Sequence, residues 1–436
     1  MKTSQFNGRD LSLILSLLFV LTAAMFQRST AGITLLEIGL LVAIPGLGVW
    51  GVLVWRQMSS RTYVAIPQSM VWLLLLGLWS VGSIFPAVAN GVDIISWGRR
   101  LFPFIVLVTV ALVTFFSIRS REHLSLLYSS LIGVQIVAVL IPLIGLLSID
   151  LSEFNNLQYL RNFGKGQHGG ILISLLFPAL VNFRRLNTVQ QAIAVFGFVI
   201  GGAGLLISFS RTMWIATAAA VGFTAIVYLY QYFPTVRTIF SYTVLAVIVV
   251  IFMYFLTPDR LRLFFLQRAR SIPNALQTGS FQDRLFELRG LLTDAFTDPL
   301  MLIIGHGWGA EYSFYSVSQY SWGGIGWTMN AYSHNYYGYL LWSIGAVGLF
   351  FFLRYCQLIF RDGIQKLLND KSDRNGIYLF GCMAAVVSLL VSSLTAPLLY
   401  EVKWAVIFAI VFGIITRVIH GYPSESGINN DEIETP

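Results

Sequence analysis

Stretches of about 20 apolar residues recur along almost the whole chain, and they limit the fold more than any other feature. A helix of about 20 residues crosses the roughly 30 Å of a bilayer core. On that measure we expect about twelve membrane-spanning helices, at residues 11–27, 32–55, 66–88, 101–118, 124–148, 168–183, 190–209, 212–232, 238–256, 334–355, 377–398 and 403–420. Only Ser210 and Arg211 separate the seventh span from the eighth, which predicts a tight turn or a re-entrant feature.

The composition agrees with an all-α integral membrane protein. Hydrophobic residues make up 56% of the 436 residues and charged residues 11%, whereas a soluble protein carries about 25% charged residues. We interpret the first apolar run as a transmembrane helix and not a cleaved signal peptide, because further spans follow it. Cys356 and Cys382 lie in or beside apolar segments, which argues against a disulfide framework or a thiolate metal site. The net charge of +8 is attributed to cytoplasmic loops and not to nucleic-acid binding.

One long hydrophilic interval divides the chain. We expect nine membrane helices in residues 1–256, one large extramembrane loop with amphipathic helices in 257–333, three membrane helices in 334–420 and a tail in 421–436. No internal repeat of about 20 to 50 residues is visible. The loop is therefore the main candidate for a domain outside the bilayer.

Lysine and arginine set the predicted orientation. With a cytoplasmic N-terminus, the short inner loops carry the basic residues that the positive-inside rule requires, namely Arg56, Arg61, Arg119, Arg121, Arg184, Arg185, Arg237, Arg354, Arg361, Lys366, Lys371 and Arg374. Both termini then lie in the cytoplasm and the large loop lies outside. Other basic residues break the rule by lying on or near the outer face: Arg161, Lys165, Arg211, Arg260, Arg262, Arg268, Arg270, Arg284 and Arg289.

The outer arginines predict a phosphate ligand. Arginine presents a planar fork that matches phosphate oxygens, so a pyrophosphate would suit several of them. Alternatively, each side chain reaches the lipid headgroups or pairs with a carboxylate. That alternative is favoured for Arg260, Arg262, Arg268 and Arg270. Arg211 stands between two apolar runs, and an ionisable residue at membrane depth indicates a functional site.

Residues 281–297 predict an amphipathic helix. Its apolar residues share one helical face: Phe281, Leu285, Leu288, Leu292 and Phe296. Its acidic residues fall on the opposite face: Asp283, Glu287 and Asp294. Arg284 and Arg289 lie on the two borders, where a helix resting on a bilayer keeps its cations. The helix could float on lipid, or close over a membrane-embedded substrate and bring an arginine to its headgroup.

Two further features follow this helix along the chain. Gly305 and Gly307 permit a tight turn with the backbone close to a ligand. His334 stands before the tenth span on the outer side, where a neutral imidazole can accept a proton from an attacking hydroxyl. The alternative for His334 is a purely structural role. The other histidines are scattered, without the spacing of a metal site.

Three motifs resemble those of the O-antigen ligase and O-antigen polymerase superfamily of bacterial envelope enzymes. In "HNYYGYLLWSIGAVG" (334–348), His334 and Asn335 are followed after nine residues by Gly345 and then by Gly348. "SRTMWI" (210–215) resembles a turn between two spans of that family. "QDRLFELRGLLTDAFTDPLMLIIGHGWGA" (282–310) resembles its segment from an arginine to a Gly-x-Gly turn. The resemblance covers mainly residues 160–355.

This resemblance implies a metal-independent glycosyltransferase without a cofactor in the bacterial inner membrane. Its donor would be a glycan on a polyprenyl (undecaprenyl) diphosphate at the periplasmic side. By the resemblance, Arg211 and Arg284 hold the diphosphate, and His334 activates the acceptor hydroxyl as a base or by orienting it. Arg289 is the alternative to Arg284, Arg161 adds outer-face charge, and Asn335, Gly305 and Gly307 support the site.

One segment departs from the family pattern. Family members often carry an asparagine between spans five and six, where this chain reads "RNFGKGQHGG" (161–170) with Gln167 and His168. The departure puts donor or acceptor specificity in doubt.

Two activities remain open within this interpretation. A ligase would transfer the glycan to lipid A-core during lipopolysaccharide biosynthesis, and a polymerase would join one repeat unit to another, with a chain-length regulator as a partner. The single large loop favours the ligase. A different class, an anion transporter or a transporter with Glu37 or Glu401 coupling protons, is less consistent with a one-sided loop and the absence of repeated halves. An interaction-only scaffold would not explain the spacing around His334.

Overall fold

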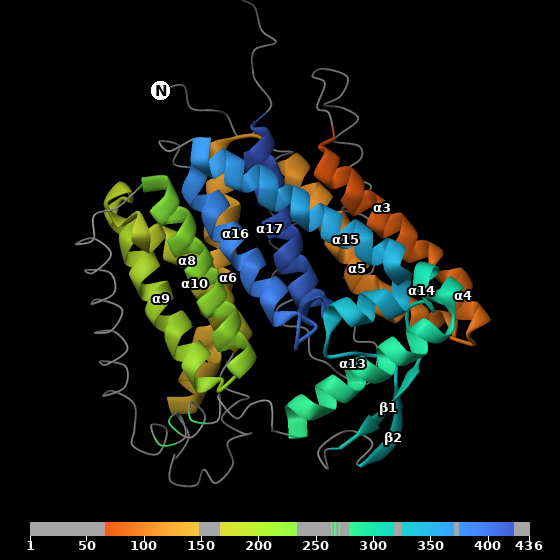
Figure 1. Cartoon of the computed structure of the whole chain (residues 1–436). Helices are drawn as coiled ribbons and strands as arrows, with labels where there is room; N and C mark the ends of the chain where they lie inside the picture. The colour runs from red at the N-terminus through yellow and green to blue at the C-terminus, as the bar shows by residue number, and fades with distance from the viewer. Residues whose placement is uncertain are drawn as a thin grey trace, which may run out of the picture.

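The protein is described here by a computed structural model that covers residues 66–147, 166–232, 279–317, 325–369 and 375–422, together with residues 263, 266 and 270. These parts of the chain are mostly helical (Figure 1). The bundle consists of α3 (Gln68–Gly82), α4 (Ile84–Ala89), α5 (Ile94–Ser117), α6 (Arg121–Leu147), α8 (Gly166–Val181), α9 (Thr188–Ile207), α10 (Arg211–Tyr232), α15 (Tyr336–Asn369), α16 (Asn375–Ser392) and α17 (Val402–His420). Short 3-10 helices lie at Phe183–Arg185 (η2) and Leu398–Tyr400 (η4).

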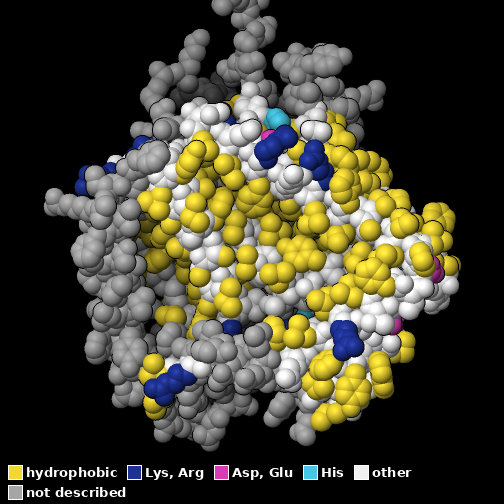
Figure 2. Space-filling view, viewed as in Figure 1, with side chains coloured by type: hydrophobic (Ala, Val, Ile, Leu, Met, Phe, Trp, Pro, Cys, Tyr) yellow, Lys and Arg dark blue, Asp and Glu magenta, His cyan; other side chains and the backbone are white. Residues whose placement is uncertain are grey.

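Length and composition make this chain a multi-pass membrane protein. Within the described residues, 7 helical stretches are long and apolar enough to cross a bilayer, and α8 and α16 are shorter apolar helices. Figure 2 shows apolar side chains in a broad band across the molecule, with lysine and arginine near its edges. Exposed apolar side chains suit a surface that faces lipid.

The predicted spans that fall on described residues each coincide with one of these helices, except that the span 66–88 is divided between α3 and α4. The predicted spans 11–27, 32–55 and 238–256 lie outside the described residues. The largest difference concerns α15, which continues to Asn369 instead of ending near residue 355. Past residue 355 the helix still has a buried face, formed by Leu358, Ile359, Gly363 and Leu367, and Arg354 Nη1 donates to Gln357 Oε1 at 2.8 Å.

The core of the bundle lies around α17. Side chains along almost the whole of this helix are buried, and its most extensive packing is against α5. In Figure 1, α15 and α16 lie beside it, α8, α9 and α10 form one flank and α3 forms the other. The first residues of α5 and α17 are therefore held firmly at one end of the bundle.

Helix α15 is interrupted at Gly345, where φ is 68° and ψ is −177°. A side chain is disfavoured there, since φ is positive and a Cβ atom would lie 2.2 Å from Ile303 O. Backbone polar groups at membrane depth need partners within the protein. Donors from other segments bond to carbonyls on the turn before the break: His306 N to Trp342 O at 2.7 Å, Gly307 N to Ser343 O at 3.0 Å and Trp79 Nε1 to Ile344 O at 2.8 Å.

A tight turn joins α9 to α10, which decides between the two predicted alternatives. Helix α9 ends at Ile207, and Phe209 in the turn has a φ of 49°. Trp214 Nε1 donates to Leu205 O at 2.9 Å and ties the two helices together across the turn. Arg211 is consequently the first residue of α10.

The described part of the large loop contains strands as well as the predicted amphipathic helix. Helix α13 (Gly279–Thr297) is followed by α14 (Pro299–Ile304), β1 (Tyr312–Ser316) and β2 (Gly326–Asn330). The strands form an antiparallel hairpin in which Tyr312 pairs with Asn330 and Ser316 with Gly326. The predicted all-α fold is therefore corrected to a mostly helical fold. The strands were missed because each has only 5 residues, too few for a clear alternating pattern.

Candidate active site

The candidate site lies at the end of the bundle where α13 and the hairpin are found, which we call the loop end (Figure 1). The first residues of α5, α10, α15 and α17 meet there. Tyr336 N donates to Ser393 O at 2.9 Å, and the Thr212 and Thr395 hydroxyls lie 2.8 Å apart. These bonds hold the starts of α15 and α10 against the segment that follows α16.

His334 and Glu287 form the central pair of the site. His334 Nδ1 lies 2.9 Å from Glu287 Oε2, and His334 N donates to Glu287 Oε1 at 3.2 Å. The Glu287 side chain is 3% exposed and that of His334 is 42% exposed. A carboxylate only accepts hydrogen bonds, so this contact assigns the proton to Nδ1. The Nε2 atom of the neutral imidazole is then left as a proton acceptor.

Tyr312 on strand β1 supplies a further donor to Glu287. Its hydroxyl lies 2.7 Å from Glu287 Oε1 and 2.7 Å from Tyr332 O, and its single proton is donated to one of them at a time. Burial raises the pKa of Tyr312, and the nearby charge of Glu287 raises it further. Tyr312 therefore remains a donor at neutral pH. Burying an acidic group is costly unless it is hydrogen-bonded, and these donors make the burial of Glu287 tolerable.

The acidic side chains of α13 face the protein. Asp283 Oδ1 accepts from Val317 N at 2.8 Å, and Asp294 Oδ2 accepts from Ser313 N at 2.9 Å. With Glu287, these bonds fasten the acidic side of α13 to the hairpin and to His334. Gly290 permits this approach, because a Cβ atom there would lie 2.6 Å from Phe314 Cβ.

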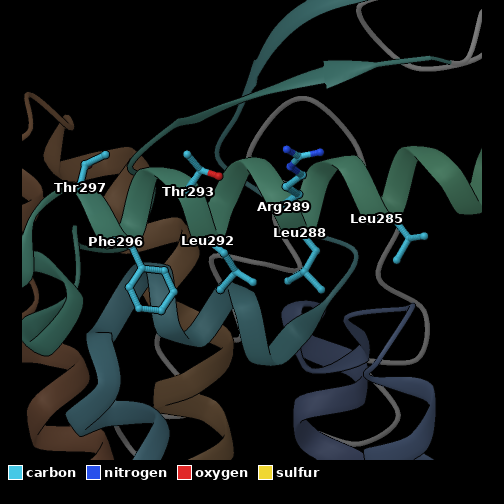
Figure 3. Close-up of a pocket in the computed structure, with 7 residues that line it drawn as sticks. All are labelled: Leu285, Leu288, Arg289, Leu292, Thr293, Phe296 and Thr297. Atoms are coloured by element: carbon cyan, nitrogen blue, oxygen red, sulfur yellow. The ribbon is translucent and has the colours of Figure 1, made fainter.

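The predicted apolar stripe of α13 lies on the side opposite the hairpin, where Leu288 and Leu292 are half-buried (Figure 3). It lines a shallow pocket on the helix surface (Figure 3), formed by Leu285, Leu288, Arg289, Leu292, Thr293, Phe296 and Thr297. Leu285 is 51% exposed and Phe296 is 64% exposed. Figure 3 shows Leu285, Leu288, Leu292 and Phe296 along one side of the helix, and we call these four residues the α13 apolar face.

The structure separates Arg284 from Arg289. Arg284 is half-buried, and its charge acts on Tyr332, whose ring centroid lies 5.3 Å from that of His334. Burial raises the pKa of Tyr332 to about 12, with Glu287 acting in the same direction and Arg284 in the opposite one. Arg289 is exposed beside the α13 apolar face. Arg284 is therefore the more enclosed of the two arginines.

The other predicted site residues have different positions. Arg211 is half-buried at the loop end, at the start of α10. Arg161 lies outside the described residues. Asn335 Oδ1 accepts from Gly338 N at 2.8 Å, and its Nδ2 donates to Leu394 O at 3.1 Å. Asn335 thus stabilises the start of α15 and connects it to the segment after α16.

Gly305 and Gly307 make their close backbone contacts with the protein itself. Both are buried, with φ values of 89° and 91°. A Cβ atom at Gly305 would lie 2.5 Å from Ser343 O, and one at Gly307 would lie 2.4 Å from Ala87. His306 between them stacks on Trp342 at a centroid distance of 3.6 Å, and burial lowers its pKa. This turn locks α14 onto the break in α15.

Sequence reasoning missed part of the wall around His334. Tyr332 also contacts Tyr400, whose ring centroid is 5.1 Å away, and the guanidinium of Arg100 lies 4.7 Å from the Tyr400 centroid. Arg99 and Arg100 directly precede the predicted span 101–118, and that position was the available signal. No sequence pattern indicated that Glu287 pairs with His334, because 47 residues separate them.

His168 occupies a buried position in the bundle. Its Nδ1 lies 2.8 Å from Gln135 Oε1, and its ring is 4.4 Å from that of Trp404. These contacts connect α8 with α6 and α17. The segment that departs from the family pattern is therefore joined to the core of the bundle at His168.

Comparison with known families supports the resemblance. Residues 196–353 match a family model described as O-antigen ligase. No curated protein matches the sequence. The matched region contains Arg211, Arg284, Glu287 and His334, which the structure places at the loop end. No group of three or more His, Cys, Asp or Glu side chains with metal-binding geometry occurs in the part of the chain that the structure describes.

Proposed function

We propose, on the premise that this chain belongs to the O-antigen ligase superfamily, that it transfers a glycan from a polyprenyl diphosphate to an acceptor hydroxyl at the periplasmic face of the bacterial inner membrane. The observation that carries the proposal is the His334–Glu287 pair, with 2.9 Å between Nδ1 and Oε2, at the loop end. A glycosyltransferase of this family needs a group that activates the acceptor. The half-exposed ring of His334 supplies one.

His334 acts as the general base in this proposal. Its Nε2 accepts the proton of the acceptor hydroxyl while the hydroxyl oxygen attacks the anomeric carbon of the donor sugar. The bond from that carbon to the phosphate oxygen breaks, and its electron pair leaves with the diphosphate. Glu287 holds the imidazole in the required tautomer and stabilises the positive charge that forms on it.

Arg284 and Arg211 bind the diphosphate leaving group. Guanidinium groups aimed at a developing negative charge lower the barrier most in a site shielded from water. Arg284 is preferred over Arg289 because it is half-buried, whereas Arg289 is exposed beside the α13 apolar face. Arg161 would add positive charge on the same side.

The α13 apolar face contacts lipid in this account. Its acidic residues are already bonded to the protein, so the exposed side combines apolar residues with the single cation Arg289. A surface helix on a bilayer has that composition. The helix would lie on the outer leaflet, with Arg284 directed towards the site and Arg289 towards lipid headgroups.

Glycan transfer accounts for the structure better than transport does. The transporter alternative needs Glu37 or Glu401 as a proton-coupling group inside the membrane. Glu401 precedes α17, its side chain is 52% exposed, and it forms an ion pair with Lys403. Glu37 lies outside the described residues. Between the two transfer reactions we favour a ligase, with lipid A-core as acceptor, and retain repeat-unit polymerisation as the alternative.

The test is reconstitution of the full chain in lipid nanodiscs. We expect it to transfer glycan from an undecaprenyl diphosphate donor to an added acceptor, and to do so after chelation of divalent metals with EDTA. Parallel reactions with lipid A-core and with a second donor repeat distinguish ligation from polymerisation. Failure to use either acceptor would contradict glycan transfer. A loss with EDTA that Mg²⁺ restores would contradict the metal-independent mechanism.

A further inference from the structure

We infer that Arg100 on α5 forms an additional oxyanion-binding subsite beside His334, which binds a phosphate or carboxylate of the glycosyl donor. This inference rests on the proposed function. Arg100 lies on the second turn of α5 and is half-buried, whereas the preceding Arg99 is exposed. The two arginines therefore differ in surroundings although they are adjacent in sequence.

A series of ring contacts leads from Arg100 to His334. The Arg100 guanidinium carbon lies 4.7 Å from the centroid of Tyr400. The Tyr400 ring is 5.1 Å from that of Tyr332, and Tyr332 is 5.3 Å from His334. Tyr339 also packs on Tyr400, at 5.7 Å, and fixes it from the side of α15. A guanidinium stacked on a fixed ring has its donors oriented in advance.

The N–H groups of the Arg100 side chain can donate hydrogen bonds to a ligand. Within the described residues, Arg100 forms no ion pair and no hydrogen bond. Its guanidinium carries five N–H donors, and because Arg100 is half-buried and not fully buried, a ligand at the loop end can reach them. The acidic residue closest in sequence to Tyr400 is Glu401, and Glu401 already pairs with Lys403. An oxyanion from the substrate would accept hydrogen bonds from these donors.

Charges of both signs act on Tyr332, the tyrosine that contacts His334. Besides burial, Glu287 and Glu401 raise its pKa, and the two cations from α13 and α5, Arg284 and Arg100, lower it. Two guanidinium groups near one point repel each other and together favour an anion between them. The anion is either the diphosphate of the carrier or a carboxylate of an acidic sugar.

The experiment compares Arg100→Gln with Arg99→Gln in nanodiscs that contain the full chain. The first probe is undecaprenyl diphosphate without glycan. We expect Arg100→Gln to weaken its binding about 10- to 100-fold, and Arg99→Gln to bind it like the unaltered protein. Arg100→Lys keeps the charge and loses the fork, so its binding should be intermediate. Thermal unfolding of each variant shows whether it has folded.

The second probe is the complete donor, and it distinguishes the source of the anion. If Arg100→Gln raises KM for the donor and leaves binding of the glycan-free carrier unchanged, the anion belongs to the glycan. If both measurements change, it belongs to the diphosphate. Tyr400→Leu, which removes the ring under the guanidinium, should shift KM in the same direction with kcat less affected.

One outcome would overturn the inference without affecting the proposed function. If folded Arg100→Gln matches Arg99→Gln in both binding and KM, Arg100 does not bind the substrate. The series includes His334→Ala as a separate reference. That variant should bind the carrier normally and lose turnover, and its retention of full turnover would contradict the proposed function itself.

Discussion

Replacing His334 with alanine is expected to lower the rate of glycan transfer about 10²- to 10⁴-fold, the usual contribution of a general base. The His334 side chain is 42% exposed, so its removal should leave the fold intact. The measurement is kcat in nanodiscs, with thermal unfolding recorded on the same sample. Full activity in folded His334→Ala would remove the general-base role.

Two further variants show whether the effect is specific to His334. Glu287→Gln keeps an oxygen that can accept from Nδ1 and removes the negative charge that stabilises the imidazolium. We expect a smaller loss than for His334→Ala, together with an altered dependence of kcat on pH. His420→Ala removes an exposed histidine from the last residue of α17, at the opposite end of the bundle, and should leave transfer unchanged.

Replacing Arg284 with alanine is expected to lower kcat about 10²- to 10³-fold, the effect of removing one donor that stabilises a developing charge. Arg211→Ala should fall in the same range. Arg289→Ala is the matched control, because it removes the same side chain from the same helix at a position beside the α13 apolar face. Its activity should stay within a few-fold of the unaltered protein, because an exposed charge usually contributes little interaction energy.

The comparison of the two α13 arginines has a clear contrary result. If Arg289→Ala loses activity and Arg284→Ala keeps it, α13 presents its other border to the diphosphate, and the assignment made here is wrong. Arg284→Lys helps to separate charge from geometry. A lysine keeps the positive charge and lacks the bidentate fork, so partial activity would indicate that both matter.

The apolar spans could be predicted because their signal is local. A run of about 20 apolar residues can be recognised without knowing its neighbours, and each such run on the described residues is helical, with the run 66–88 divided into α3 and α4. Helix α15 extends beyond its predicted end because hydropathy locates the membrane-spanning part of a helix and not the residue at which the helix ends. Its last turns are instead stabilised by packing of buried residues such as Ile359 and Leu367.

The position of α13 could be predicted only in part. The period of its apolar residues correctly gave a helix at 281–297, and the structure extends it to Gly279–Thr297. The pattern could not show that the acidic face would be buried. That outcome depends on backbone and side-chain donors of the hairpin and on His334, which come from later parts of the chain.

The candidate site combined local and distant signals. His334 and Arg211 were visible as ionisable residues at the ends of apolar runs. Glu287 and Arg100 gain their positions through contacts that span the loop or the whole bundle, as in the stacking of Arg100 on Tyr400. A sequence without the fold gives no sign of such contacts.

The side of the membrane on which the site lies is the central claim, and cysteine labelling measures it most directly. Cys356 and Cys382 are buried, so single added cysteines can be followed after both are replaced by alanine. Gln282→Cys on α13 and His420→Cys at the far end of α17 both occupy exposed positions. In intact spheroplasts, a membrane-impermeant maleimide should label residue 282 at once and residue 420 only after lysis. Labelling of residue 420 in intact spheroplasts, with residue 282 protected until lysis, would contradict the account.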